Sequence, residues 1–122
     1  ARQVVAKRYA ERLAGIVKPA HMPAGNRSAW AQYAIETPVR DGLKAHLQGQ
    51  GIPSVIYYVK PLHQQVAYQH FPRTPGGLPV SEALPERILC LPMHPYLSES
   101  DQDQICDAIA GYIGHNAAIA AE

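Results

Sequence analysis

The side chains best suited to chemistry lie close together, in a stretch that reads YYVKPLH from Tyr57 to His63. It offers two phenols, an amine and an imidazole. A phenol can stack on a sugar ring and donate a hydrogen bond to a hydroxyl or a carboxylate, or Tyr57 and Tyr58 can simply be large β-forming residues that fill a sheet. Because adjacent strand residues point to opposite faces, at most one of these tyrosines can face a ligand.

Lys60 and His63 are weaker candidates for catalysis. A nucleophilic lysine needs burial or a cationic neighbour to release its proton at neutral pH, and the sequence indicates neither beside Lys60. His63 and His70 would share one face of a continuous helix, but at seven residues apart they could not hold one metal without a bend. His94, before Pro95, is better suited to a structural role, in which a ring nitrogen bonds to a carbonyl of the turn. We therefore predict no catalytic residue and no metal ligand in this chain.

Composition excludes several classes of partner. Eleven Lys and Arg against ten Asp and Glu give a net charge of +1, which is too small for the positive field that nucleic-acid binding needs. The longest apolar runs are far too short to span a bilayer, and the start has no signal-peptide core. Cys90 and Cys106 have no metal-binding spacing and are expected to be reduced and buried. We expect a cytoplasmic protein without nucleic-acid or membrane partners.

Several elements must position the YYVKPLH stretch, and the first is a helix over residues 1–16. Val5, Tyr9, Leu13 and Ile16 recur there at helical spacing, and no capping residue precedes them. We take the missing cap as a hint that residue 1 lies inside a longer helix. Alternation over 29–37 then predicts a strand, with Trp30 a core anchor or part of a partner-facing patch.

The next elements alternate between helix and strand. Residues 39–50 carry one apolar stripe and predict a helix with Gly51 as its C-terminal cap. Residues 53–59 have the β-branched and aromatic content of a central strand covered on both faces. Helical turns over 65–70 and 81–87 flank a surface loop, PRTPGGLP.

The chain is predicted to close with a strand and a helix. Residues 88–93 are strand-like, and Ser98 with Asp101 resembles a capping box that starts a final helix. That helix has Ile105, Ile109 and Ile113 as its apolar stripe, and we expect fraying from His115 onward. The fold class is α+β: a small sheet of about three or four strands flanked by helices, in one domain over residues 1–122.

Four stretches together resemble one protein family. They are the opening helix, RSAWAQYAIE at 27–36, RDGLKAHLQGQGIPSVIYYVKPLHQQVAY at 40–68, and SEALPERILCLPMHPYLSESDQDQI at 81–105. They look like the C-terminal part of the DegT/DnrJ/StrS sugar aminotransferases, with an aspartate-aminotransferase-like fold. The combination of YYxKPLH with LPMHPYL at this separation is much more specific than either motif alone.

The resemblance implies that most of the catalytic machinery lies elsewhere. In this family a large N-terminal domain holds pyridoxal phosphate (PLP) through a lysine, and a smaller C-terminal domain closes over the nucleotide-sugar. We expect the large domain to be absent from this chain, so that no cofactor is bound by its four lysines, Lys7, Lys18, Lys44 and Lys60. Family members work as dimers, which implies a homo-oligomer.

The resemblance also assigns the site residues. The family carries a His-Tyr or Tyr-Tyr pair at this strand end, lining the sugar pocket, and Tyr57 and Tyr58 stand there. With Lys60 and His63 they are our predicted substrate-binding residues. Val59 departs from the proline that the family usually has, which restores a backbone donor and leaves the pocket geometry open.

The leading hypothesis is a C-terminal fragment of a PLP-dependent enzyme. That enzyme transfers an amino group, from an amino acid such as glutamate, to a nucleotide-linked keto-sugar in polysaccharide or O-antigen biosynthesis. The fragment alone is expected to be inactive, and its exposed domain interface to make it self-associate. The alternative is a stand-alone ligand-binding or assembly module of related fold. A generic ferredoxin-like regulatory domain fits the order of elements but explains none of the motifs.

Overall fold

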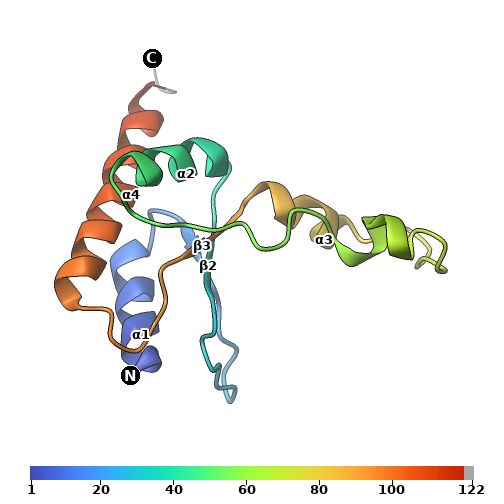
Figure 1. Cartoon of the computed structure of the whole chain (residues 1–122), viewed down its shortest axis with the longest axis horizontal. Helices are drawn as coiled ribbons and strands as arrows, with labels where there is room; N and C mark the ends of the chain where they lie inside the picture. Colours follow the sequence, from blue (N-terminus) through green and yellow to red (C-terminus); the bar gives the residue numbers. More distant parts are fainter. Residues whose placement is uncertain (120–122) are drawn as a thin grey trace.

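The computed structural model describes residues 1–119 and has helices on one face of a small sheet, with an arm projecting from the other side (Figure 1). Among these residues the helices are α1 (Arg2–Leu13), α2 (Arg40–Gly49), α3 (Pro79–Ala83) and α4 (Glu99–Ile119). The strands are β1 (Lys18–Pro19), β2 (Tyr33–Glu36) and β3 (Ile88–Leu91). The α+β class with a three-stranded sheet is confirmed.

The sheet is antiparallel with the order β1-β2-β3, so β2 is the central strand. Tyr33 pairs with Leu91 and Glu36 with Ile88. The strand predicted over 29–37 starts only at Tyr33, because Trp30 adopts a φ of 48° and interrupts the extended backbone before it. Sequence reasoning missed β1, whose two residues show no alternation; an ion pair of 2.8 Å between Lys18 Nζ and Glu36 Oε1 joins it to β2.

The prediction of a central strand over 53–59 is wrong. Only Val55 pairs in the structure, in an isolated bridge with Cys90, and from Tyr57 onward the side chains are exposed. Val55 and Cys90 exchange both backbone hydrogen bonds, at 2.9 and 3.0 Å. No strand lies on the other side of Val55 within residues 1–119, so the segment leaves the sheet edge and enters the arm.

The helix boundaries follow the predicted capping residues. Beyond α2, Gly51 has a φ of 73°, its N–H donates to Gln48 O and the N–H of Ile52 donates to Leu47 O, which together form a Schellman motif. Before α4, Ser98 Oγ accepts a bond of 3.1 Å from the N–H of Asp101. Both ends were correctly predicted.

The last helix is longer than expected, and the turns of the arm are shifted. The fraying predicted from His115 is not observed in the described residues, since α4 continues to Ile119; residues 120–122 lie outside them. In place of one turn over 65–70, two 3-10 turns span Leu62–Gln64 and Val66–Tyr68. The turn predicted over 81–87 appears as α3 followed by a 3-10 turn over Leu84–Glu86.

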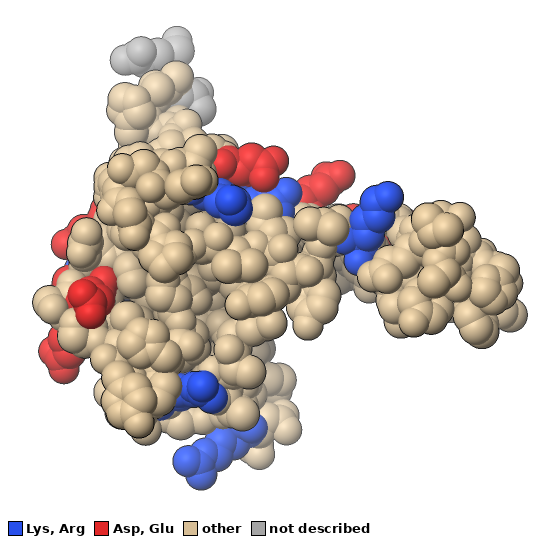
Figure 2. All heavy atoms as spheres, in the orientation of Figure 1, with Lys and Arg blue, Asp and Glu red and all other residues tan. Residues whose placement is uncertain are grey.

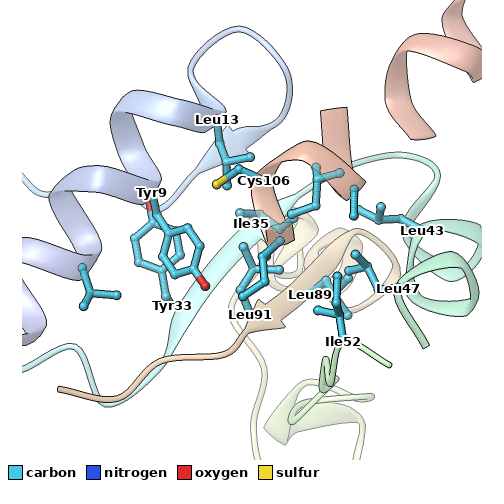
Figure 3. Packing of buried hydrophobic residues seen from close by; sticks show 14 of the residues in the cluster. Tyr9, Leu13, Tyr33, Ile35, Leu43, Leu47, Ile52, Leu89, Leu91 and Cys106 are labelled. Carbon is cyan, nitrogen blue, oxygen red and sulfur yellow. The ribbon is translucent and has the colours of Figure 1, made fainter. Parts of the chain in front are cut away.

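The core fills the space between the sheet and the three long helices (Figure 3). Tyr9 of α1 stacks on Tyr33 of β2 with ring centroids 5.0 Å apart, and the Tyr9 hydroxyl donates to Pro92 O at 3.0 Å. Trp30 packs against Tyr33 at 5.4 Å, which assigns it to the core. No helix within residues 1–119 has the length and apolarity required to cross a membrane.

Candidate functional site

The predicted site stretch lies on the arm, which we define as residues 57–87. The arm leaves the sheet beside Val55 and returns into β3, so its two limbs run side by side away from the body (Figure 1). Arg40 at the start of α2 fastens the base, because its Nη1 donates to Pro85 O at 2.8 Å. The helical layer therefore determines where the arm begins.

A groove of about 880 Å³ lies between the two limbs, and we call it the arm groove. Apolar and aromatic side chains make up most of its walls, among them Tyr58, Tyr68 and Phe71. Lys60, His63, Gln65 and Ser81 supply its polar groups. A concave, mostly apolar site with a few polar groups is typical of small-molecule binding, and this volume is in the usual range.

His63 fastens one limb of the arm to the other. Its Nε2 lies 3.0 Å from Glu82 Oε1 of α3, and its backbone oxygen accepts a bond of 3.3 Å from Arg73 Nη2. His63 and His70 share no helical face, because two separate 3-10 turns replace a continuous helix. Residues 1–119 contain no group of three or more His, Cys, Asp or Glu that could hold a metal ion.

Tyr57 does not line the arm groove. It borders a separate hollow of about 120 Å³, on the sheet edge, together with Gln32, Ser54, Cys90 and Met93. The side chain of Tyr57 is 54% exposed and that of Tyr58 is 64% exposed. The structure thus brings Tyr58, Lys60 and His63 together in one groove and places Tyr57 in another.

Sequence reasoning missed Tyr68, Phe71, Gln65 and Ser81 as lining residues of the groove. The sequence contained only a weak indication of this role. Tyr68 and Phe71 are aromatic residues beside a segment rich in proline and glycine, which offers no core in which they could be buried. Tyr68 and Phe71 instead contact each other with ring centroids 6.1 Å apart. His94 matches its predicted structural role, although its Nδ1 accepts from the N–H of Tyr96, at 3.3 Å, rather than bonding a carbonyl.

The arm carries an unusually apolar surface for an exposed element. Figure 2 shows its far end almost free of charged side chains, with both basic and acidic side chains nearer the body. The exposed apolar side chains along it are Tyr57, Tyr58, Val59, Leu62, Val66, Tyr68, Phe71, Leu78 and Val80. Contiguous apolar surface of this kind marks a site of binding or assembly.

The model of one protein family matches most of this chain. It describes the DegT/DnrJ/EryC1/StrS aminotransferase family and matches residues 1–110. The chain belongs to this family. Since the match covers α1, α2, the first part of α4, the sheet and the whole arm, the arm groove is part of the family domain rather than an addition to it.

Two similar proteins are sugar aminotransferases by name. UDP-N-acetyl-3-dehydro-alpha-D-glucosamine 3-aminotransferase of Acidithiobacillus ferrooxidans is 40% identical over 83% of this chain and 27% of its own length. UDP-2-acetamido-2-deoxy-3-oxo-D-glucuronate aminotransferase of Pseudomonas aeruginosa is 34% identical over 88% of this chain and 30% of its own. The chain therefore spans less than a third of these relatives.

A solved structure confirms the fold. A DegT DnrJ EryC1 StrS aminotransferase from Brucella abortus superposes with a TM-score of 0.90 and 66% sequence identity, over 93% of this chain and 30% of that one. The same arrangement of elements therefore occurs in a solved member of the family.

The residues described here do not fit PLP as a covalently held cofactor. A lysine that carries it must sit in an enclosed pocket, and none of the four lysines is buried. Lys18 pairs with Glu36, and Lys7 lies 3.7 Å from Glu11. Lys60 is exposed beside the arm groove.

Titratable groups with clearly raised pKa values lie in the core and at the sheet edge. Burial raises the pKa of the Cys106 thiol to about 11 and that of the Tyr33 phenol to about 12. Burial also raises the pKa values of Tyr9 and Cys90. Both cysteines are free and buried, as predicted. These groups are protonated at neutral pH.

Proposed function

We propose that this chain is the C-terminal part of an aminotransferase that acts on a nucleotide-linked keto-sugar in the cytoplasm. The membership of residues 1–110 in the DegT/DnrJ/EryC1/StrS family carries this proposal. The names of the two relatives support it, because both refer to amino transfer to a UDP-linked oxo-sugar. The donor would be an amino acid such as glutamate, and the product would serve polysaccharide or O-antigen biosynthesis.

In this proposal the chain binds and orients the substrate, and the rest of the longer protein supplies the catalytic groups. Tyr58, Lys60 and His63 contact the substrate from the arm groove, where the apolar walls exclude water. Tyr57 borders the neighbouring hollow and does not contact a ligand in the arm groove. PLP, held by the large domain, would accept and return the amino group. This chain alone is therefore inactive.

The apolar surface of the arm also supports a homo-oligomer as the working form. Exposed side chains such as Val59, Val66 and Val80 gain by burial against a protein surface, since each fully buried side chain of this size contributes roughly 1.5–3 kcal/mol. Sedimentation of the 122-residue chain tests this part. We expect association at high concentration, and a clean monomer would contradict it.

A stand-alone binding or assembly module is the second candidate. One observation favours it: this chain lines the arm groove from both limbs of the arm. In that case ligand binding by the chain would be its whole function, and a longer protein that contains the chain would show no amino transfer.

The decisive experiment compares the 122-residue chain with the longer gene product that contains it. Each is incubated with PLP, glutamate and a UDP-linked 3-oxo sugar, and mass spectrometry detects the amino sugar. We expect product from the longer protein only. Borohydride trapping adds a second readout: a stoichiometric PLP adduct on a single lysine of the short chain would contradict the proposed division of roles.

A further inference from the structure

We propose that a hollow outside the arm binds a small aromatic carboxylate. The hollow has a volume of about 520 Å³ and lies between one face of α1 and residues 19–33, and we call it the α1 hollow. Its volume is in the range usual for small-molecule sites. It shares no lining residue with the arm groove, so the inference goes beyond the proposed function.

Trp30 forms a fixed wall of the α1 hollow. Its φ of 48° lies in the left-handed region, where a bulky residue is strained. Two hydrogen bonds of 3.0 Å hold it there: its backbone N–H donates to Ser28 Oγ, and its indole Nε1 donates to Gln3 Oε1 of α1. Strained residues that their surroundings hold in place cluster at binding sites. The conformation of Trp30 is therefore a first indication of a ligand.

The apolar lining of the α1 hollow suits a flat ring. Ala6 and Ala10 of α1 contribute only methyl groups, which leave space above this face of the helix. Trp30 and Met22 also line the hollow, and both are half-buried, so each keeps some surface for a ligand. An indole packs well against another ring, and a thioether makes favourable contacts with aromatic groups.

The charges of the α1 hollow favour an anion. Lys7 and His21 line it, and within residues 1–119 no acidic side chain does. Lys7 lies 3.7 Å from Glu11, but the two side chains are 77% and 65% exposed. Water screens such a pair, so the ammonium group can still attract a second carboxylate. A negatively charged ligand therefore meets a lining with a net positive charge.

The hydroxyl of Tyr33 is a second, independent indication of a polar ligand. Tyr33 is fully buried and lines the α1 hollow, yet its hydroxyl has no hydrogen-bond partner within residues 1–119. Nearly all buried polar groups are paired, and a carboxylate oxygen in the hollow would pair this one. Because burial raises the pKa of the phenol to about 12, it keeps its proton at neutral pH and can donate it to an anion.

The fluorescence of Trp30 gives a direct test, because Trp30 is the only tryptophan of the chain. The 122-residue chain is titrated with phenylacetate as the probe and with phenylethanol as its uncharged match. We expect a saturable change in the emission of Trp30 with phenylacetate. Phenylethanol should bind more weakly, because it has the same ring without the negative charge.

Three variants test the site. Ala10→Leu should fill the α1 hollow and abolish binding of phenylacetate. Val4→Leu is the matched control, because Val4 lies on the same helix, is 67% exposed and does not line the hollow. Lys7→Gln should weaken phenylacetate by up to about fivefold and leave phenylethanol unchanged. Tyr33→Phe keeps the ring and should weaken phenylacetate about tenfold.

Three results would overturn the inference. The first is unchanged binding in Ala10→Leu, which would place the probe elsewhere; if circular dichroism shows that this variant does not fold, the exposed Lys7→Gln variant decides instead. The second is equal affinity for phenylacetate and phenylethanol, which would mean that the carboxylate is not recognised. The third is binding to the 122-residue chain but none to the longer protein by calorimetry, which would assign the α1 hollow to a contact with the rest of that protein.

Discussion

The rings of Tyr57 and Tyr58 lie 6.5 Å apart with their planes at 50°, yet the two side chains border different hollows. Tyr58 lines the arm groove, while Tyr57 lines the small hollow at the sheet edge. The alternation expected of neighbouring residues in an extended chain thus persists although no regular strand forms there. A ligand in the arm groove contacts Tyr58 and not Tyr57.

Removing either tyrosine should leave folding intact. Because both side chains are more than half exposed, we expect Tyr57→Ala and Tyr58→Ala to change the free energy of unfolding by no more than about 0.5 kcal/mol. Thermal denaturation followed by circular dichroism measures this. Tyr9→Ala, which empties a fully buried position, should instead cost about 3–5 kcal/mol. Equal losses at all three positions would mean that the arm is part of the folded core.

A glycine sets the contact between α2 and α4. A Cβ at Gly42 would overlap the hydroxyl of Tyr112, so Gly42→Ala should destabilise the chain by about 1–3 kcal/mol from overpacking. This outweighs the helix-propensity gain of roughly 1 kcal/mol.

The sign of that effect should reverse once Tyr112 is shortened. In a Tyr112→Ala background the clash is absent and only the propensity gain remains, so the added Gly42→Ala should stabilise by up to about 1 kcal/mol. Urea denaturation of the four proteins in this cycle gives both values. A destabilising Gly42→Ala in both backgrounds would contradict the contact.

The Tyr9 hydroxyl ties α1 to the end of β3. It donates to Pro92 O at 3.0 Å from a fully buried ring, so Tyr9→Phe removes a donor and leaves a carbonyl without its partner. We expect a loss of about 1 kcal/mol, and up to about 3 if water cannot reach Pro92 O. Urea denaturation is the measurement. An unchanged midpoint would show that the bond contributes nothing net.

Stability should fall in alkaline solution because of the buried thiols. Burial raises the pKa of Cys106 from 9.0 to about 11, so the folded chain keeps a proton that the unfolded chain loses. This contribution is fully present below pH 9 and is lost as the pH rises through 11. Burial also raises the pKa of Cys90, which adds to this loss of stability. Tyr33 adds to it at higher pH, because burial raises its pKa from 10.0 to about 12.

A variant without thiols separates these contributions. In Cys90→Ala/Cys106→Ala, the alkaline loss of stability should begin about one pH unit later, when the buried phenols of Tyr33 and Tyr9 remain. The measurement is the urea midpoint as a function of pH. The same onset in both proteins would exclude the thiols as its cause.

The helical layer could be predicted from sequence because its signals are local. Gly51 and Ser98 each mark a helix end through their own backbone or side-chain bonds, and the stripe through Ile105 and Ile109 is buried as expected. The sequence could not show that residues 53–59 form no regular strand. Their β-branched and aromatic residues are equally suited to a sheet and to an exposed binding surface. Which of the two occurs depends on whether a neighbouring strand exists.

Only one of the two limbs that line the arm groove could be predicted from the sequence. A single stretch contained Tyr58, Lys60 and His63, so their proximity followed from sequence distance alone. The opposite limb, with Ser81 and Glu82, reaches the groove only because the chain turns back through the PRTPGGLP loop. No periodicity encodes such a return, and the bond between His63 and Glu82 is therefore visible only in the structure.

The most direct test of the account is product formation from a UDP-linked 3-oxo sugar with glutamate and PLP, measured by mass spectrometry. We predict an amino sugar from the longer protein, a strong reduction with Tyr58→Ala in that protein, and none from the 122-residue chain. Amino sugar produced by the short chain, or full activity of the longer protein without the Tyr58 ring, would contradict the assignment of substrate binding to the arm groove.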